Sequence, residues 1–191
     1  MLEGLFDWFQ SFGMAFTVLG LSFIFMLDST VIPTPPEFFA VLAFLIRPSP
    51  EWAGILLVAI CLSELAGNSI MYSLVKWKRL PGFVERAIKK WIGFLVLKDE
   101  RIILLNRVAP VMPFTGAFIA TCNWNYKKSM LYLAIGCLLK YSALFALVAL
   151  FDYQFDRDTA QVVSIMAVIM VVALSMLASY IYRKRHGPAG D

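Results

Sequence analysis

Residues 102–122 read IILLNRVAPVMPFTGAFIATC, an apolar stretch interrupted by an arginine and two prolines. The stretch has the length of a membrane-spanning helix, about 20 residues, but proline inside a helix removes a donor and clashes with the preceding turn. Basic sequence flanks it on both sides, in residues 76–101 and at Lys127 and Lys128. Basic loops stay on the cytoplasmic side of a membrane. We therefore expect a re-entrant helical hairpin that bends near Pro110 and Pro113 and leaves on the face where it entered.

A second proline-rich motif interrupts the apolar stretch 31–46. Residues 33–37 read PTPPE, and a helix from Pro33 to Arg47 would be only about 21 Å long at 1.5 Å per residue. That length is too short to cross a bilayer. If residues 12–27 cross from the inside to the outside, the segment 28–46 forms a second hairpin that enters from the opposite face.

The composition indicates a membrane protein. Of 191 residues, 60% are apolar and 16% are charged, and the mean hydropathy is +0.75, whereas soluble domains are nearer 45–50% apolar and about 25% charged. A chain this short has too little interior to bury that much apolar surface from water. The composition excludes a soluble enzyme and a disordered chain, and it predicts a single integral membrane domain over residues 1–191.

The remaining apolar stretches and the charges between them predict the topology. Four stretches read as spanning helices: 12–27, 52–75, 130–150 and 162–182. The basic tail at 183–185 places the C-terminus in the cytoplasm, and the acidic loop 152–158 lies outside. We predict an all-α polytopic protein of the plasma or inner membrane, with about four spanning helices and two opposed re-entrant hairpins. The expected parts are a first hairpin and helix (28–75), a cytoplasmic amphipathic linker (76–101), a second hairpin and helix (102–151) and a C-terminal spanning helix (159–182).

A weak internal repeat supports two matching halves. The spacing Pro33-x-x-Pro36 recurs as Pro110-x-x-Pro113. Each motif is followed by an ionisable residue inside a spanning helix, Glu64 at 64 − 36 = 28 positions and Lys140 at 140 − 113 = 27. Halves that enter from opposite faces in the same order are typical of an inverted repeat.

Several ionisable residues lie at bilayer depth, where each costs on the order of 2.5–3.5 kcal/mol on insertion scales. Such residues persist when they pair or line a wet cavity, so they are candidates for substrate binding or for coupling. The expected set is Asp28, Glu37, Glu64, Arg107 and Lys140.

Each candidate has a functional and a structural interpretation. Glu37 is a proton acceptor or the cap of its own helix. Arg107 holds a phosphate with its fork of donors or forms an ion pair with Glu37 or Glu64. Lys140 is expected to neutralise Glu64, and a buried pair that holds the bundle together is the favoured interpretation there.

Polar residues at the helix breaks complete the expected site. Thr34 and Thr115 with Gly116 lie at the starts of the two half-helices, where unsatisfied backbone N–H groups favour anions. Asn68 shares a helix face with Glu64 at four residues' spacing.

The sequence offers no set of catalytic or metal-binding residues. Its three cysteines, Cys61, Cys122 and Cys137, lie in or beside apolar stretches without metal spacing, and its one histidine, His186, is in the C-terminal tail. We expect no catalytic residue, no metal and no cofactor, and therefore no enzyme. Nucleic acid is not an expected partner, because the basic run at 76–101 is short and tied to the bilayer.

Four motifs in order resemble a known family. They are a proline-rich turn ending in glutamate (33–37), a glycine-bearing helix ending in tyrosine (67–72), an arginine–proline hairpin (107–110), and an aromatic, basic link before a second glycine-bearing helix (126–136). Over residues 30–150 the ordered set resembles the DedA family, also called the SNARE-associated or VTT-domain family. The resemblance implies opposed re-entrant hairpins, lipid translocation, and transport of polyprenyl-phosphate carriers driven by an ion gradient.

The chain also departs from the family pattern. Asn68 stands where aspartate is usual, and Glu64 one turn earlier is a candidate substitute. Pro113 stands where a second arginine is common. Lys140 stands where tryptophan is frequent, and it would restore a positive charge.

The expected function is a transporter or scramblase for a phosphate-bearing lipid, either a phospholipid or a polyprenyl phosphate, with proton or cation coupling left open. Two other functions fit the same residues: a proton-coupled transporter of a small soluble solute, and a non-transporting membrane organiser. Membrane lipids are the expected partners, and a homo-oligomer is compatible with the sequence.

Overall fold

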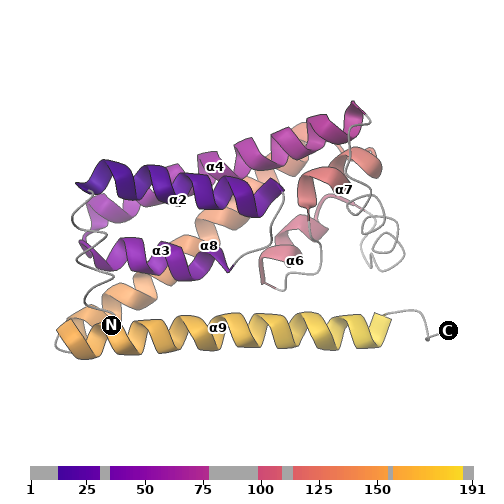
Figure 1. Cartoon of the computed structure of the whole chain (residues 1–191). Coiled ribbons are helices and arrows are strands. Elements are labelled where there is room, and N and C mark those ends of the chain that lie inside the picture. Colours follow the sequence, from indigo (N-terminus) through magenta and orange to yellow (C-terminus); the bar gives the residue numbers. More distant parts are fainter. Residues whose placement is uncertain (1–12, 31–34, 78–98, 109–113, 155–156, 187–191) are drawn as a thin grey trace.

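A computed structural model describes residues 13–30, 35–77, 99–108, 114–154 and 157–186 (Figure 1). The described residues form α-helices and include no strand. In chain order the helices are α2 (Gly13–Thr30), α3 (Pro36–Leu45), α4 (Pro50–Lys76), α6 (Ile102–Val108), α7 (Thr115–Thr121), α8 (Tyr126–Gln154) and α9 (Arg157–His186). The expectation of an all-helical chain is confirmed for these residues.

Three of these helices are long and apolar enough to cross a membrane: Gly13–Thr30, Pro50–Lys76 and Tyr126–Phe151. They correspond to the first three predicted spans. Large apolar side chains on them are exposed at the protein surface, among them Phe16, Val58, Leu62, Leu131 and Leu139. The fourth predicted span, 162–182, lies inside the single helix α9. The chain is thus built as a helical membrane protein.

Helices α2 and α3 form the first hairpin. Arg47, just after α3, donates to the sulfur of Met14 at the start of α2 over 4.0 Å, so the two helices are antiparallel (Figure 1). Helix α2 runs parallel to α4, since Gly67 of α4 lies against Met26 and Ser29 near the end of α2.

This arrangement differs from the predicted hairpin of residues 28–46. The first arm is the whole of α2, because the helix continues through Asp28 to Thr30, where the hydroxyl donates to the carbonyls of Met26 (2.9 Å) and Leu27 (3.2 Å). The beginning of α2 therefore lies at the same end of the molecule as Arg47. The bend itself, with Pro33 and Thr34, lies outside the described residues.

The second hairpin consists of α6 and α7. Before α6, a carboxylate oxygen of Glu100 accepts from the backbone N–H of Asn125 at 2.9 Å, and Asn125 follows α7. Lys76, at the end of α4, donates to Asn123 over 3.2 Å. The chain between residues 100 and 125 therefore returns to its starting point. Pro110 and Pro113, at the predicted bend, lie outside the described residues, but a helix ends before them and another begins after them.

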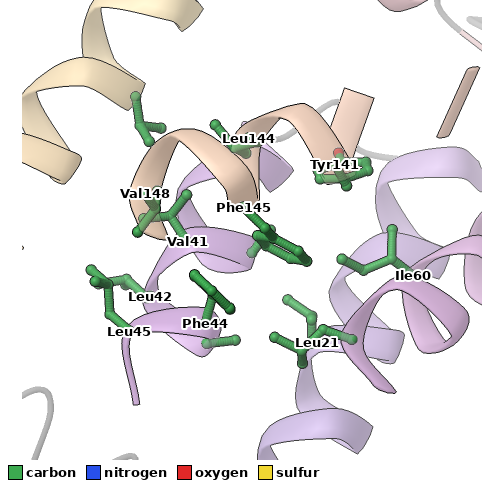
Figure 2. Close-up of a cluster of buried hydrophobic side chains, with 14 of the residues drawn as sticks. Leu21, Val41, Leu42, Phe44, Leu45, Ile60, Tyr141, Leu144, Phe145 and Val148 are labelled. Atoms are coloured by element: carbon green, nitrogen blue, oxygen red, sulfur yellow. The ribbon is translucent and has the colours of Figure 1, made fainter. Parts of the chain in front are cut away.

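The short helices α3 and α7 are enclosed by the rest of the protein. Residues 40–45 of α3 are all buried, as are residues 115–120 of α7. Phe44 of α3 stacks on Phe145 of α8 with ring centroids 4.8 Å apart, and Figure 2 shows both in a core shared with α2, α4 and α8. A helix that is apolar on every side is stable only when it is surrounded. Helices α3 and α7 therefore sit inside the bundle, and the long helices carry most of the exposed large apolar side chains.

Candidate functional site

Glu37 lies at the start of the enclosed helix α3. Pro36 occupies the first helical position and Glu37 the first turn, and Pro35 at the N-cap supplies no side-chain acceptor. Proline suits this position because the first N–H groups of a helix have no partner within it. The carboxylate of Glu37 is therefore placed beside the positive end of the α3 dipole.

Lys140, in the middle of α8, forms an ion pair with Glu37. The Glu37 side chain is 16% exposed and that of Lys140 is 25% exposed, so the pair is largely covered by protein. The Lys140 ammonium also lies 5.4 Å from the ring centroid of Tyr141, which packs edge-on against Phe25 of α2. A lysine in the middle of a long apolar helix is stabilised by an opposite charge and an aromatic face together.

This pairing differs from the predicted one. Lys140 was expected opposite Glu64, and Glu37 or Glu64 opposite Arg107, but the structure places Lys140 against Glu37. Arg107 belongs to α6, and its side chain lies outside what the structure describes. Glu64 is 2% exposed on α4. Asp28 lies half-buried in the last turn of α2.

Asn68 joins α4 to the start of α7. Its side-chain carbonyl accepts from the N–H of Gly116 at 2.8 Å, while its amide donates to the carbonyl of Glu64 at 2.9 Å. The side chain of Asn68 is 3% exposed. A Cβ on Gly116 would lie 2.2 Å from the backbone carbonyl oxygen of Asn68, so only glycine permits this approach of α7 to α4.

The N–H of Gly116 was expected to face a substrate. In the structure it is donated to Asn68, and a ligand at that N–H would have to displace an amide. Thr115 accepts from Asn106 of α6 over 3.4 Å, which links the two arms of the second hairpin. The first turn of α7 is thus held by two asparagines from different helices.

The end of α2 connects these two groups of residues. Phe25 contacts Tyr141, the neighbour of Lys140, and Met26 and Ser29 contact Gly67, the neighbour of Asn68. The last turns of α2 therefore pack against α8 beside Lys140 and against α4 beside Asn68.

Two contacts near the hairpins were missed by the sequence reasoning. The indole N–H of Trp52 in α4 donates to the Ala43 carbonyl of α3 at 2.8 Å, and Ser69 shares a hydrogen bond of 2.8 Å with the hydroxyl of Tyr126. The signal for the first was available, because a buried tryptophan needs an acceptor for its N–H.

Within the described ranges, no group of three or more histidine, cysteine, aspartate or glutamate side chains is placed to hold a metal ion. No family model, curated protein or solved structure matches the chain.

Proposed function

We propose that the protein moves a phosphate-bearing lipid across the membrane, as a transporter or scramblase of the DedA type. The observation that carries the proposal is the Glu37–Lys140 ion pair, which joins the start of an enclosed half-helix to the middle of a long apolar helix. Non-helical backbone at membrane depth is tolerated where protein surrounds it or where it lines a cavity. Broken helices of this kind form the substrate sites of many transporters.

The proposed topology follows from the order of the helix ends. The Lys76 end of α4, with Lys127 and Lys128, is cytoplasmic, and the Arg47 end is outside. The α2–α3 hairpin then enters from the outside and the α6–α7 hairpin from the cytoplasm. Helix α9 crosses back and leaves the C-terminus in the cytoplasm of a plasma or inner membrane.

In the proposed mechanism the lipid phosphate competes with Glu37 for Lys140. An ammonium that already binds a carboxylate binds a phosphate by the same charge-assisted hydrogen bonds. When the phosphate arrives, Glu37 is released and takes up a proton or another cation, which keeps the site neutral. Arg107 is proposed as a second cation for the phosphate.

A reconstitution assay tests the ion pair directly. The protein is placed in liposomes that carry a fluorescent phospholipid or a polyprenyl phosphate, and a membrane-impermeant quencher measures how much lipid reaches the outer leaflet. We expect the double variant Glu37→Gln/Lys140→Met, which removes both charges together, to flip lipid at least 10-fold more slowly than the wild type. Leu139→Met, one residue away on the exposed face of α8, is the matched control and should flip normally.

The same assay separates the alternatives. Normal flipping by the double variant would remove the proposed roles of both residues. A wild type without flipping, but with proton uptake on addition of a soluble solute, would identify a solute transporter. If the protein is a membrane organiser, removing the charges of Glu37 and Lys140 should change its stability, and the wild type should move neither lipid nor solute.

A further inference from the structure

The cytoplasmic end of α8 breaks a local electrostatic rule. Lys127 and Lys128 occupy the first turn of this helix, where the helix dipole is positive and cations are unfavourable. Asn125 caps the start of α8, because its side-chain oxygen accepts from the backbone N–H of Lys128 at 3.1 Å. The first turn of α8 contains no acidic residue, whereas the first turn of α4 contains Glu51. Lysines at the positive end of a helix, where no acidic residue of the same turn offsets them, indicate that a negatively charged partner binds there.

The acidic groups nearby do not balance these lysines. Among the described residues at this end, the basic side chains are Lys76, Arg101, Lys127 and Lys128, and the acidic ones are Asp99 and Glu100. Asp99 lies 3.9 Å from Arg101. Glu100 accepts from the backbone of Asn125 and also attracts Lys128 and Arg101. The described part of this end therefore carries a surplus of 4 − 2 = 2 positive charges.

Exposed aromatic side chains accompany the surplus charge. Trp77, directly after α4, is 69% exposed, and Tyr126, the first residue of α8, is 37% exposed. Tyr126 packs on Tyr72 of α4 with ring centroids 4.8 Å apart, so the ends of the two helices are joined. Tryptophan and tyrosine at helix ends are typical of the membrane–water boundary. Aromatic rings beside surplus lysines fit the headgroup layer of anionic lipid.

We propose that this surface, formed by Lys76, Trp77, Tyr126, Lys127 and Lys128, binds the headgroups of anionic phospholipids as stabilising partners. The lipid supplies counter-charge for the surplus that Asp99 and Glu100 leave at this end. Lys128 and Lys140 are separated by about 18 Å along α8 at 1.5 Å per residue, so this surface is distinct from the proposed transport site. The inference does not depend on the transport function.

The test is a melting experiment on the whole chain in a neutral detergent. We expect added phosphatidylglycerol to raise the melting temperature of the wild type more than phosphatidylcholine does. Lys127→Gln/Lys128→Gln should lose about half or more of that extra shift, since each basic residue near an anionic surface contributes comparably. Without lipid, this variant should melt close to the wild-type temperature, because removing cations from the positive end of a helix offsets the loss of the attraction between Lys128 and Glu100.

Three controls make the experiment decisive. Arg47→Gln, at the other end of the bundle, should keep the whole lipid shift. Inorganic phosphate at matched ionic strength should produce no shift, which separates a lipid headgroup from a free anion. Native mass spectrometry should count fewer phosphatidylglycerol adducts on the lysine variant than on the wild type.

Several results would overturn the proposal. One is an equal shift from both lipids in the wild type, and another is a full phosphatidylglycerol shift in the lysine variant. A lysine variant that melts well below the wild type without lipid would show that these lysines stabilise the fold directly. An equal shift from inorganic phosphate would replace the lipid surface with a simple anion site.

Discussion

The two hairpins use different chemistry to hold a short helix inside the same bundle. The first, α2–α3, has a long outer arm and an apolar core, and it carries a charge at the start of its inner helix. The second, α6–α7, has two arms of seven residues each, and neutral amides hold the start of its inner helix. A charged contact can exchange partners with an anion, whereas a neutral amide contact fixes a position. Under the proposed function, we expect the first hairpin to respond to substrate and the second to support it.

The largest expected effect is on the ion pair of the first hairpin. Lys140→Met leaves the carboxylate of Glu37 largely buried without its partner, and breaking such a pair costs about 4 kcal/mol. Adding Glu37→Gln should restore more than half of that loss, because no charge is then stranded. Unfolding of the single and double variants in detergent measures the coupling. Additive losses would show that the two residues do not interact.

A slightly smaller effect is expected where the second hairpin meets α4. Gly116→Ala places a methyl group against the backbone of Asn68, and overpacking of this kind costs up to about 3 kcal/mol. Gly20→Ala is the matched control, since nothing lies within 4 Å of a Cβ there. That change should be neutral or stabilising by up to about 1 kcal/mol, through helix propensity. Equal melting temperatures for the two variants would contradict the close approach of α7 to α4.

The amide contact itself is expected to contribute less. Asn68→Ala leaves the buried N–H of Gly116 without an acceptor, which costs about 2 kcal/mol. Asn106→Ala removes the longer bond to Thr115 and should cost under about 1 kcal/mol. Thermal unfolding of both variants ranks the two contacts. The opposite ranking would mean that α6, rather than α4, positions the start of α7.

The smallest effect is a pH dependence at the base of the second hairpin. The hydrogen bond from the Asn125 backbone lowers the pKa of Glu100 below its usual value of 4.5, and Lys128 and Arg101 lower it further. A lowered pKa in the folded state means that the stabilisation is present above pH 4.5 and is lost as the pH falls through the folded pKa. Glu100→Gln should therefore melt with a weaker pH dependence below pH 4.5 than the wild type. If the melting temperature of Glu100→Gln falls below pH 4.5 as steeply as that of the wild type, the contact between Glu100 and Asn125 does not close the hairpin.

Local chemistry explains which features were predictable from the sequence. Proline acts on the turn that contains it, so two interruptions of helix could be predicted without any knowledge of packing. They lie between the end of α2 at Thr30 and the start of α3 at Pro36, and between the end of α6 at Val108 and the start of α7 at Thr115. The positions of α4 and α8 could also be predicted directly, because each follows from the length of an apolar stretch.

The partners of the charged residues were not predictable, because they depend on how the helices pack. Lys140 was expected opposite Glu64, but the packing of α8 against α3 places it against Glu37. The direction of α2 was also open, since its first residues carry too little charge to fix a side. The bond from Gly116 to Asn68 requires a backbone approach that no spacing rule reveals.

Gly67 and Asn68 are consecutive residues of α4, yet the first contacts α2 and the second contacts α7. Successive helix positions differ by about 100° in direction, so one register of α4 serves both neighbours at once. A single residue inserted between Pro50 and Gly67 would turn both contacts away from their partners while leaving the helix intact. Natural variation in this helix should consequently favour substitutions at outward positions such as Val58 and Leu62, and should avoid changes in its length.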